Sequence, residues 1–145
     1  MSLQLLFEKL PSVQDWIART LAEHSQQARS VATYQFPRLG KFYSKELLTA
    51  AKVVEVEHVL VPPLSALGLT GFGEFEDGNY AGITFLDTYF VQSGEARSES
   101  LHFHELVHVV QWQHLGAARF VMAYALGYLQ GGGYRANPLE VMAYD

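Results

Sequence analysis

The sequence predicts a single domain of the α+β class, in which a small twisted sheet precedes a helical C-terminal part. Two runs rich in β-branched and aromatic residues, 52–61 and 80–91, have the composition of strands. From Glu95 onward the hydrophobic spacing changes from a period of two residues to about 3.6, which is typical of helices. A chain of 145 residues has room for one hydrophobic core. We therefore divide residues 1–145 into a mostly helical N-terminal part (1–50), a sheet (52–91) and a helical part (95–145).

The N-terminal part is expected to contain two helices and a short strand. Residues 12–27 have the apolar spacing of an amphipathic helix that begins after Pro11. Residues 31–36 are expected to form a short strand that Pro37 ends, and residues 44–51 a second helix. This part of the chain contains no motif that points to a function.

The predicted sheet consists of a strand over residues 52–61 and a hairpin over residues 71–91. Asp77-Gly78 is a common sequence at hairpin turns, and it precedes the long β-rich run. Asp87 lies inside that run among apolar residues. We expect it to form a hydrogen-bonded bend, with a role in a functional site as the alternative.

The C-terminal part is expected to contain three helices. The segment Glu99–Leu115 contains no proline or glycine and is followed by Gly116, a favourable C-cap, so it predicts a well-defined helix. Residues 117–129 predict a second helix, which the three glycines at 131–133 interrupt. Asn137-Pro138 begins a last short helix, because asparagine favours the N-cap and proline the first helical position.

Composition excludes several classes of function. The net charge of −5 and a pI near 5.6 argue against nucleic acid or an anionic membrane as partner, because both require clustered cations. The chain has no cysteine, which excludes disulfides, thiol catalysis and thiolate metal sites. The absence of a secretory signal and of a long apolar span predicts a cytoplasmic protein. A hydrophobic fraction of 49% in a short chain is compatible with a homodimer.

A His-Glu-x-x-His motif lies inside the predicted helix Glu99–Leu115, at His104, Glu105 and His108. Four residues along a helix bring both imidazoles to one face, one turn apart, where they can bind the same metal ion. Glu105 lies about 100° round the helix, within reach of a water bound to that ion. This pattern arises by chance only about 0.02 times in a chain of this composition. It therefore predicts a metal site.

A catalytic zinc site requires a third protein ligand, which in this chain has to be histidine, aspartate or glutamate. His114 lies about 80° away from the face of His104, and His102 lies on the opposite face, so neither fits. Glu140, on the last helix, is the better candidate, because a second helix can cross the first and complete a two-His, one-Glu set. The alternative is that Glu140 only caps its own helix by hydrogen bonding to the amide of Asn137.

The sequence resembles the gluzincin group of zinc metallopeptidases, in which two histidines of the first motif and a downstream glutamate bind zinc. The resemblance is carried by His104, Glu105 and His108, followed 32 residues after His108 by Glu140. The strings HFHELVHVVQW, ITFLDTYFV and NPLEVMAY are also similar to small bacterial zincin-like domains. The resemblance covers about residues 60–145. It implies a zincin-like fold, Zn²⁺ as cofactor and a peptide or protein substrate.

The resemblance also implies catalytic roles. Glu105 would take a proton from the zinc-bound water and return it to the leaving amine. A tyrosine from the downstream helices would stabilise the oxyanion, and Tyr134, beside the glycine run, is preferred over the other candidates, which are Tyr124, Tyr128 and Tyr144.

Two further residues are candidates to support the metal ligands. Gln111, three residues after His108, can orient that histidine from the same helix. Gluzincins place an aspartate three or four residues after the third ligand, where this chain has Ala143 and Tyr144. Asp145 lies one position later and is the remaining candidate for that role.

Two functions of other classes remain as alternatives to a zinc peptidase. The same histidines can hold a metal ion without turnover, in an inactive zincin or an interaction module. A helical packing domain without metal, in which the histidines are satisfied by their neighbours, is the third hypothesis.

Overall fold

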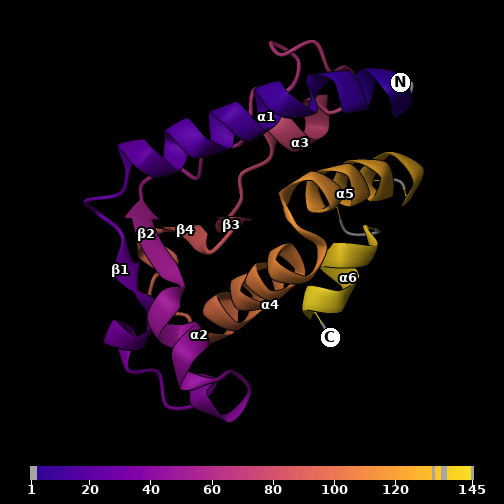
Figure 1. Cartoon of the computed structure of the whole chain (residues 1–145). Helices are drawn as coiled ribbons and strands as arrows, with labels where there is room; N and C mark the ends of the chain where they lie inside the picture. The colour runs from indigo at the N-terminus through magenta and orange to yellow at the C-terminus, as the bar shows by residue number, and fades with distance from the viewer. Residues whose placement is uncertain (1–2, 132, 135–136, 145) are drawn as a thin grey trace.

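The computed structural model of the chain describes residues 3–131, 133–134 and 137–144, which form a mixed α+β arrangement as predicted (Figure 1). None of the helices in these ranges is long and apolar enough to cross a membrane. Three short 3₁₀ turns lie at Val31–Tyr34, Leu39–Lys41 and Ser93–Glu95. The helices and strands, in chain order, are α1 (Leu3–Glu23), β1 (Arg29–Ser30), α2 (Lys45–Ala50), β2 (Lys52–Val56), α3 (Gly73–Asp77), β3 (Gly82–Phe85), β4 (Thr88–Gln92), α4 (Glu99–Leu115), α5 (Ala117–Gly131) and α6 (Pro138–Tyr144).

The described strands form one sheet in the order β1-β2-β4-β3. β3 and β4 are an antiparallel hairpin, while β2 runs parallel to β4, with Val53 opposite Tyr89. β1 pairs with the other edge of β2, antiparallel to it. As a result, β3 lies at an edge of the sheet, and it packs against α4.

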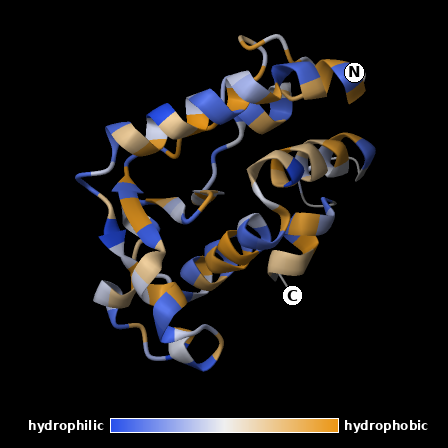
Figure 2. Cartoon of the chain, in the orientation of Figure 1, coloured by the Kyte–Doolittle hydropathy of each residue, from blue (hydrophilic) through white to orange (hydrophobic). Residues whose placement is uncertain are grey.

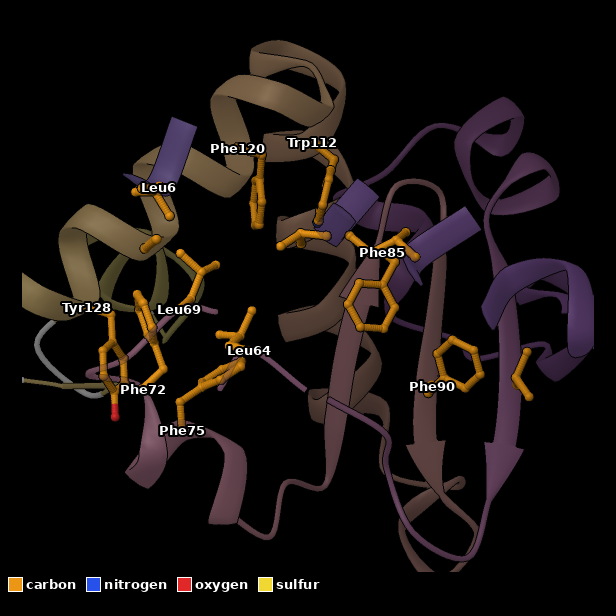
Figure 3. Packing of buried hydrophobic residues seen from close by; sticks show 14 residues of the cluster. Leu6, Leu64, Leu69, Phe72, Phe75, Phe85, Phe90, Trp112, Phe120 and Tyr128 are labelled. Atoms are coloured by element: carbon orange, nitrogen blue, oxygen red, sulfur yellow. The ribbon is translucent and has the colours of Figure 1, made fainter. Parts of the chain in front are cut away.

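Apolar side chains are buried on both faces of the sheet. Successive residues of a strand point to opposite faces, so Val53 and Val54 belong to different clusters. Val53 packs with Leu106 of α4 on one face. Val54 packs on the other face with residues of α1 and with a large aromatic cluster (Figure 3). The sheet therefore has α4 on one face and α1 on the other.

The N-terminal helix is longer than predicted and contains Pro11 in its interior. A proline there removes one backbone hydrogen bond and normally bends or ends a helix. Here Leu6 and Leu10 before the proline, and Val13 and Ile17 after it, are all buried on one face. Packing of this continuous apolar stripe compensates for the lost hydrogen bond, so the prediction of a start after Pro11 was wrong.

Three predictions about strands and turns need correction, the first in the N-terminal part and the other two in the sheet. Residues 31–34 form a 3₁₀ turn, and the strand lies before them at β1, so the predicted strand at 31–36 was wrong. The strand predicted over 52–61 ends at Val56. Asp77-Gly78 does not form the hairpin turn, because Asp77 ends the short helix α3 and the chain turns instead at Leu86-Asp87.

The C-terminal helices agree closely with the prediction. α4 has the predicted bounds, with the hydroxyl of Ser98 accepting a hydrogen bond from the amide of Leu101 and Gly116 at a φ of 79° after its last turn. α5 extends two residues beyond the predicted range, and α6 begins at Pro138. Figure 2 shows that hydrophilic residues alternate with hydrophobic ones along α4. Several of these hydrophilic residues are buried, and they form the site described next.

Candidate metal centre

The crossing of α4 and α6 brings His104, His108 and Glu140 together. One carboxylate oxygen of Glu140, Oε1, lies 3.0 Å from the Nε2 atom of each histidine. The two Nε2 atoms are 3.3 Å apart. All three side chains are buried, with exposed fractions of 7%, 4% and 4%. The residues therefore offer three potential ligand atoms to one point between two helices.

The spacing of these atoms fits a metal ion of the size of zinc. Ligand atoms about 2.0–2.1 Å from a tetrahedral zinc lie about 3.3 Å apart. The separations of 3.0, 3.0 and 3.3 Å between the nitrogens of His104 and His108 and the oxygen of Glu140 are close to this value. Two imidazoles and one carboxylate are also a donor set that zinc accepts in catalytic sites.

Gln111 determines which nitrogen of His108 carries the proton. Its amide nitrogen donates to the carbonyl of Leu139, 3.1 Å away, so its Oε1 faces His108 as an acceptor. The Nδ1–H of His108 donates to this oxygen at 2.8 Å. In the neutral imidazole the lone pair is then on Nε2, directed at Glu140. While His108 is neutral, this nitrogen and Oε1 of Glu140 are two acceptors 3.0 Å apart that repel each other, and either a cation between them or a proton on Nε2 removes that repulsion.

The second oxygen of Glu140 is occupied by Tyr124 of α5, whose hydroxyl donates to Oε2 at 2.6 Å. Asn137 holds the start of α6 against α5 by donating to the carbonyl of Tyr124. The amide of Asn137 itself donates to the carbonyl of Tyr134. The carboxylate of Glu140 therefore faces the histidines and Tyr124, and the alternative in which it only caps its own helix was wrong.

A glycine of α5 permits this contact between α5 and α6. A Cβ atom on Gly127 would lie 2.7 Å from Oδ1 of Asn137, closer than real atoms approach. Any larger residue would push α6 away from α5 and move Glu140 with it. Gly127 is therefore part of the support for Glu140, the candidate third ligand.

The charges in the cluster are mutually stabilising. Burial favours the neutral form of Glu140, but the hydrogen bonds from His104 and His108 outweigh burial and lower the pKa of this carboxyl to about 2. Burial alone would lower the pKa of His108, yet the hydrogen bond and the negative charge of Glu140 raise it above its ordinary value. Glu140 is therefore ionised at neutral pH, as a metal ligand has to be.

Glu105 lies beside the three candidate ligand residues and is hydrogen-bonded to the edge strand β3. The hydroxyl of Thr84 is 2.7 Å from its Oε1, while its Oε2 lies 3.9 Å from Nε2 of His104. A Cβ atom on Gly82 would lie 3.0 Å from the same Oε2, so this glycine leaves room for the carboxylate. Burial raises the pKa of Glu105, which suits a group that accepts and then releases a proton.

The centre lies where an open cleft meets a smaller apolar cavity. The cleft has a volume of about 690 Å³ and is lined by residues that include His104, Glu105 and Phe103. The cavity has a volume of about 100 Å³ and reaches the cluster at Glu105, His108 and Glu140. Tyr80 and Tyr134 line both. The cleft and the cavity therefore adjoin beside the candidate metal ligands.

The tyrosines that the sequence offered as candidates to stabilise an oxyanion have different surroundings in the structure. Tyr134 lies at the junction of cleft and cavity, with its ring centroid 5.3 Å from that of Tyr80. Tyr124 contacts Glu140 instead of the cleft. Tyr128 packs among Phe72 and Phe75 in the core. The backbone of residue 144 belongs to α6, and its side chain lies outside the described part, as does all of Asp145.

His102 and His114, the other two histidines of α4, lie apart from the candidate metal centre, as their angles around the helix predict. His102 is fully buried on the opposite side of α4, where Tyr89 and the carbonyl of Ala96 contact its two ring nitrogens at 2.7 and 2.8 Å. His114 is exposed near the end of α4. Asp87 lies in the hairpin turn, where its carbonyl accepts from the amide of Lys52.

Sequence reasoning missed Gly82 and Thr84 and did not assign Tyr124 its contact with Glu140. A signal for the first two is present in the string GITF of β3. With a period of two, glycine and threonine share one face, while Ile83 and Phe85 share the other. A small and a polar residue together on one face of an otherwise apolar strand indicate a neighbour that is polar and close, which here is Glu105.

Comparison of the chain with models of protein families, with curated proteins and with solved structures finds no significant match.

Proposed function

We propose that the protein is a zinc-dependent hydrolase of peptide bonds, with His104, His108 and Glu140 as metal ligands and Glu105 as general base. The observation that supports this most is the convergence of three ligand atoms at 3.0–3.3 Å beside a fourth, separately held carboxylate. A purely structural metal site is closed by protein ligands, whereas here the described residues supply three and border an open cleft.

Zinc bound by these residues would polarise a substrate carbonyl and acidify a water molecule. The proton transfers and the stabilisation of developing charge would be carried out by side chains of the protein. Oε2 of Glu105 accepts the proton of the attacking water, while Thr84 holds Oε1 and so fixes the direction of the carboxylate. Glu105 then donates the proton to the leaving amine. Tyr134, which lines both the cleft and the cavity, would donate a hydrogen bond to the substrate carbonyl oxygen as negative charge develops there.

A metal-binding module without turnover is the second candidate. It is favoured by the burial of Glu105, which is 2% exposed, is hydrogen-bonded to Thr84 and leaves no room for a Cβ atom at Gly82. In such a module Glu105 would serve to balance the charge of the ion. The two candidates share the metal site and differ in whether a substrate is turned over.

A peptide-library digest followed by mass spectrometry separates the two candidates. The wild type is compared with Glu105→Gln, which keeps the shape of the side chain and removes its basicity, and with Glu57→Gln at an exposed position as control. We expect zinc-dependent cleavage by the wild type and the control, and a loss of at least about 100-fold in Glu105→Gln with zinc content unchanged. Full zinc content without cleavage of any peptide by the wild type would contradict the hydrolase and support the module.

A further inference from the structure

A short segment between β1 and α2 lines one side of the open cleft and is attached to α4. The carboxylate of Glu99 accepts hydrogen bonds from the backbone amides of Arg38 and Leu39, at 2.7 and 3.0 Å. A few residues later, the hydroxyl of Tyr43 donates to the carbonyl of Phe103 at 3.0 Å. Because α4 also contains the His-Glu-x-x-His motif, these contacts define the position of the segment relative to the candidate metal centre.

The segment places the ring of Phe42 against the ring of Phe103. The two ring centroids are 5.2 Å apart, and the ring planes are at 90° to each other. Both residues line the cleft together with His104 and Glu105, and Phe42 is 63% exposed. Phe103 is the residue before His104 in α4. The cleft therefore has an accessible aromatic surface close to the candidate metal centre.

The perpendicular rings favour a planar aromatic group as the occupant. A ring that stacks parallel to one of them meets the other at about 90°, so it makes both the stacked and the edge-to-face contacts that aromatic pairs prefer. An aliphatic group gains only from the burial of its apolar surface. The described charged side chains that line the cleft outside the candidate centre have both signs, with Arg38 against Glu95 and Glu99. Their charges therefore favour neither an acidic nor a basic group.

We propose that Phe42 and Phe103 bind an aromatic side chain of a peptide that lies in the cleft. A cavity of about 150 Å³ holds benzene, so a cleft of about 690 Å³ has room for such a ring together with peptide backbone. Both rings are in place before the peptide arrives, which reduces the entropy lost on binding. The substrates would then be peptides with an aromatic residue close to the cleaved bond, and only this claim rests on the proposed function.

Three small amides test the proposal without metal or turnover. They are the N-acetyl methylamides of phenylalanine, of cyclohexylalanine, whose ring has the same carbon skeleton but is neither planar nor aromatic, and of alanine. Affinities for the full, metal-free chain are measured by NMR titration, together with contacts between the ligand ring and the ring of Phe42. Phe42→Ala removes one wall of the proposed site. Phe7→Ala is its matched control, because Phe7 is 67% exposed on α1 and does not line the cleft.

We expect the wild type to bind the phenylalanine amide at least about 10-fold more tightly than the alanine amide and about 3-fold more tightly than the cyclohexylalanine amide. Phe42→Ala should weaken the phenylalanine amide about 5-fold and remove its advantage over cyclohexylalanine, while Phe7→Ala should change neither. Equal or tighter binding of the cyclohexylalanine amide by the wild type, or equal affinities of the two variants, would overturn the proposal.

The NMR contacts in the wild type decide the matter even if Phe42→Ala does not fold. Contacts between the bound phenylalanine ring and the ring of Phe42 are expected. Absence of binding, or binding without these contacts, would overturn the proposal.

These results are independent of the proposed function. Absence of zinc-dependent cleavage, with the phenylalanine amide still bound at Phe42, would contradict the hydrolase alone. Zinc-dependent cleavage by a chain that does not prefer the phenylalanine amide would overturn the aromatic site alone.

Discussion

The hydroxyl of Tyr124 donates to Oε2 of Glu140 at 2.6 Å, while Oε1 of the same carboxylate faces His104 and His108. The two oxygens of Glu140 thus have different partners from different helices. Because Tyr124 holds Oε2, this arrangement would present the single oxygen Oε1 to a metal ion bound by the two histidines.

Replacing Tyr124 should therefore weaken metal binding without removing a ligand. We expect Tyr124→Phe to lower the affinity for zinc about 10- to 100-fold, as is typical when the hydrogen-bond partner of a ligand is lost. Tyr128→Phe, on the same helix but packed against Phe72 and Phe75, is the matched control. Zinc affinities are measured by competition with a chelator. Equal affinities of the two variants would show that Tyr124 does not orient Glu140.

Gln111 should affect metal binding through the tautomer of His108. Gln111→Leu removes the acceptor that keeps the proton on Nδ1, so we expect zinc affinity to fall about 10-fold. Gln113→Leu, at an exposed position of the same helix, should leave the affinity unchanged. An NMR spectrum of the imidazole nitrogens of metal-free protein supplies the second readout. A proton on Nε2 of neutral His108 in the wild type would contradict the assignment.

Replacing Gly82 should lower the turnover rate and leave the metal content unchanged. A Cβ atom there would come within 3.0–3.2 Å of three side-chain atoms of Glu105 and displace the carboxylate from the position that Thr84 defines. We expect Gly82→Ala to lower kcat at least 10-fold while zinc content stays at that of the wild type. Gly94→Ala adds the same methyl group where no atom lies within 4 Å, and it should have no effect. Equal kcat values for both variants would show that Glu105 tolerates the displacement.

His102 should make the fold sensitive to mild acid. Burial lowers its pKa below the ordinary value of 6.5, so below that pH the unfolded chain takes up a proton that the folded chain does not. The contribution of His102 to stability is therefore constant above about pH 6.5 and declines as the pH falls. Urea denaturation of the metal-free protein between pH 7 and 5 should show a steeper loss for the wild type than for His102→Gln. Parallel curves, or an NMR titration of His102 at or above pH 6.5, would contradict this.

The helical part of the fold was predictable because its signals are local. The bounds of α4 follow from the absence of proline and glycine up to Gly116, and its cap at Ser98 is formed within four residues. The pairing of β2 with β4 was not predictable, because parallel strands 36 residues apart in the chain leave no local signal. The hairpin turn was missed because Leu86 occupies a φ of 60° that glycine or asparagine normally signals.

The candidate ligands were predictable from their spacing in the sequence and by elimination of other residues. Most of the residues that orient these ligands and Glu105 were not. His104 and His108 follow from helical geometry, and Glu140 from the lack of cysteine and the poor angle of His114. The contact of Tyr124 with Glu140 depends on tertiary packing, which a single sequence does not reveal. Gly82 and Thr84 left only a weak signal, a small and a polar residue on one face of β3. Gln111 is the exception, because it lies one turn from His108 on the same helix.

The zinc content of the purified protein tests the central claim most directly. After loading with zinc and removal of excess metal, elemental analysis should give one equivalent per chain in the wild type and in the exposed control Glu57→Gln. Glu140→Gln, which keeps the shape of the third ligand, should retain a small fraction of that amount under the same treatment. Less than about a tenth of an equivalent in the wild type, or one equivalent in Glu140→Gln, would contradict a zinc site built from His104, His108 and Glu140.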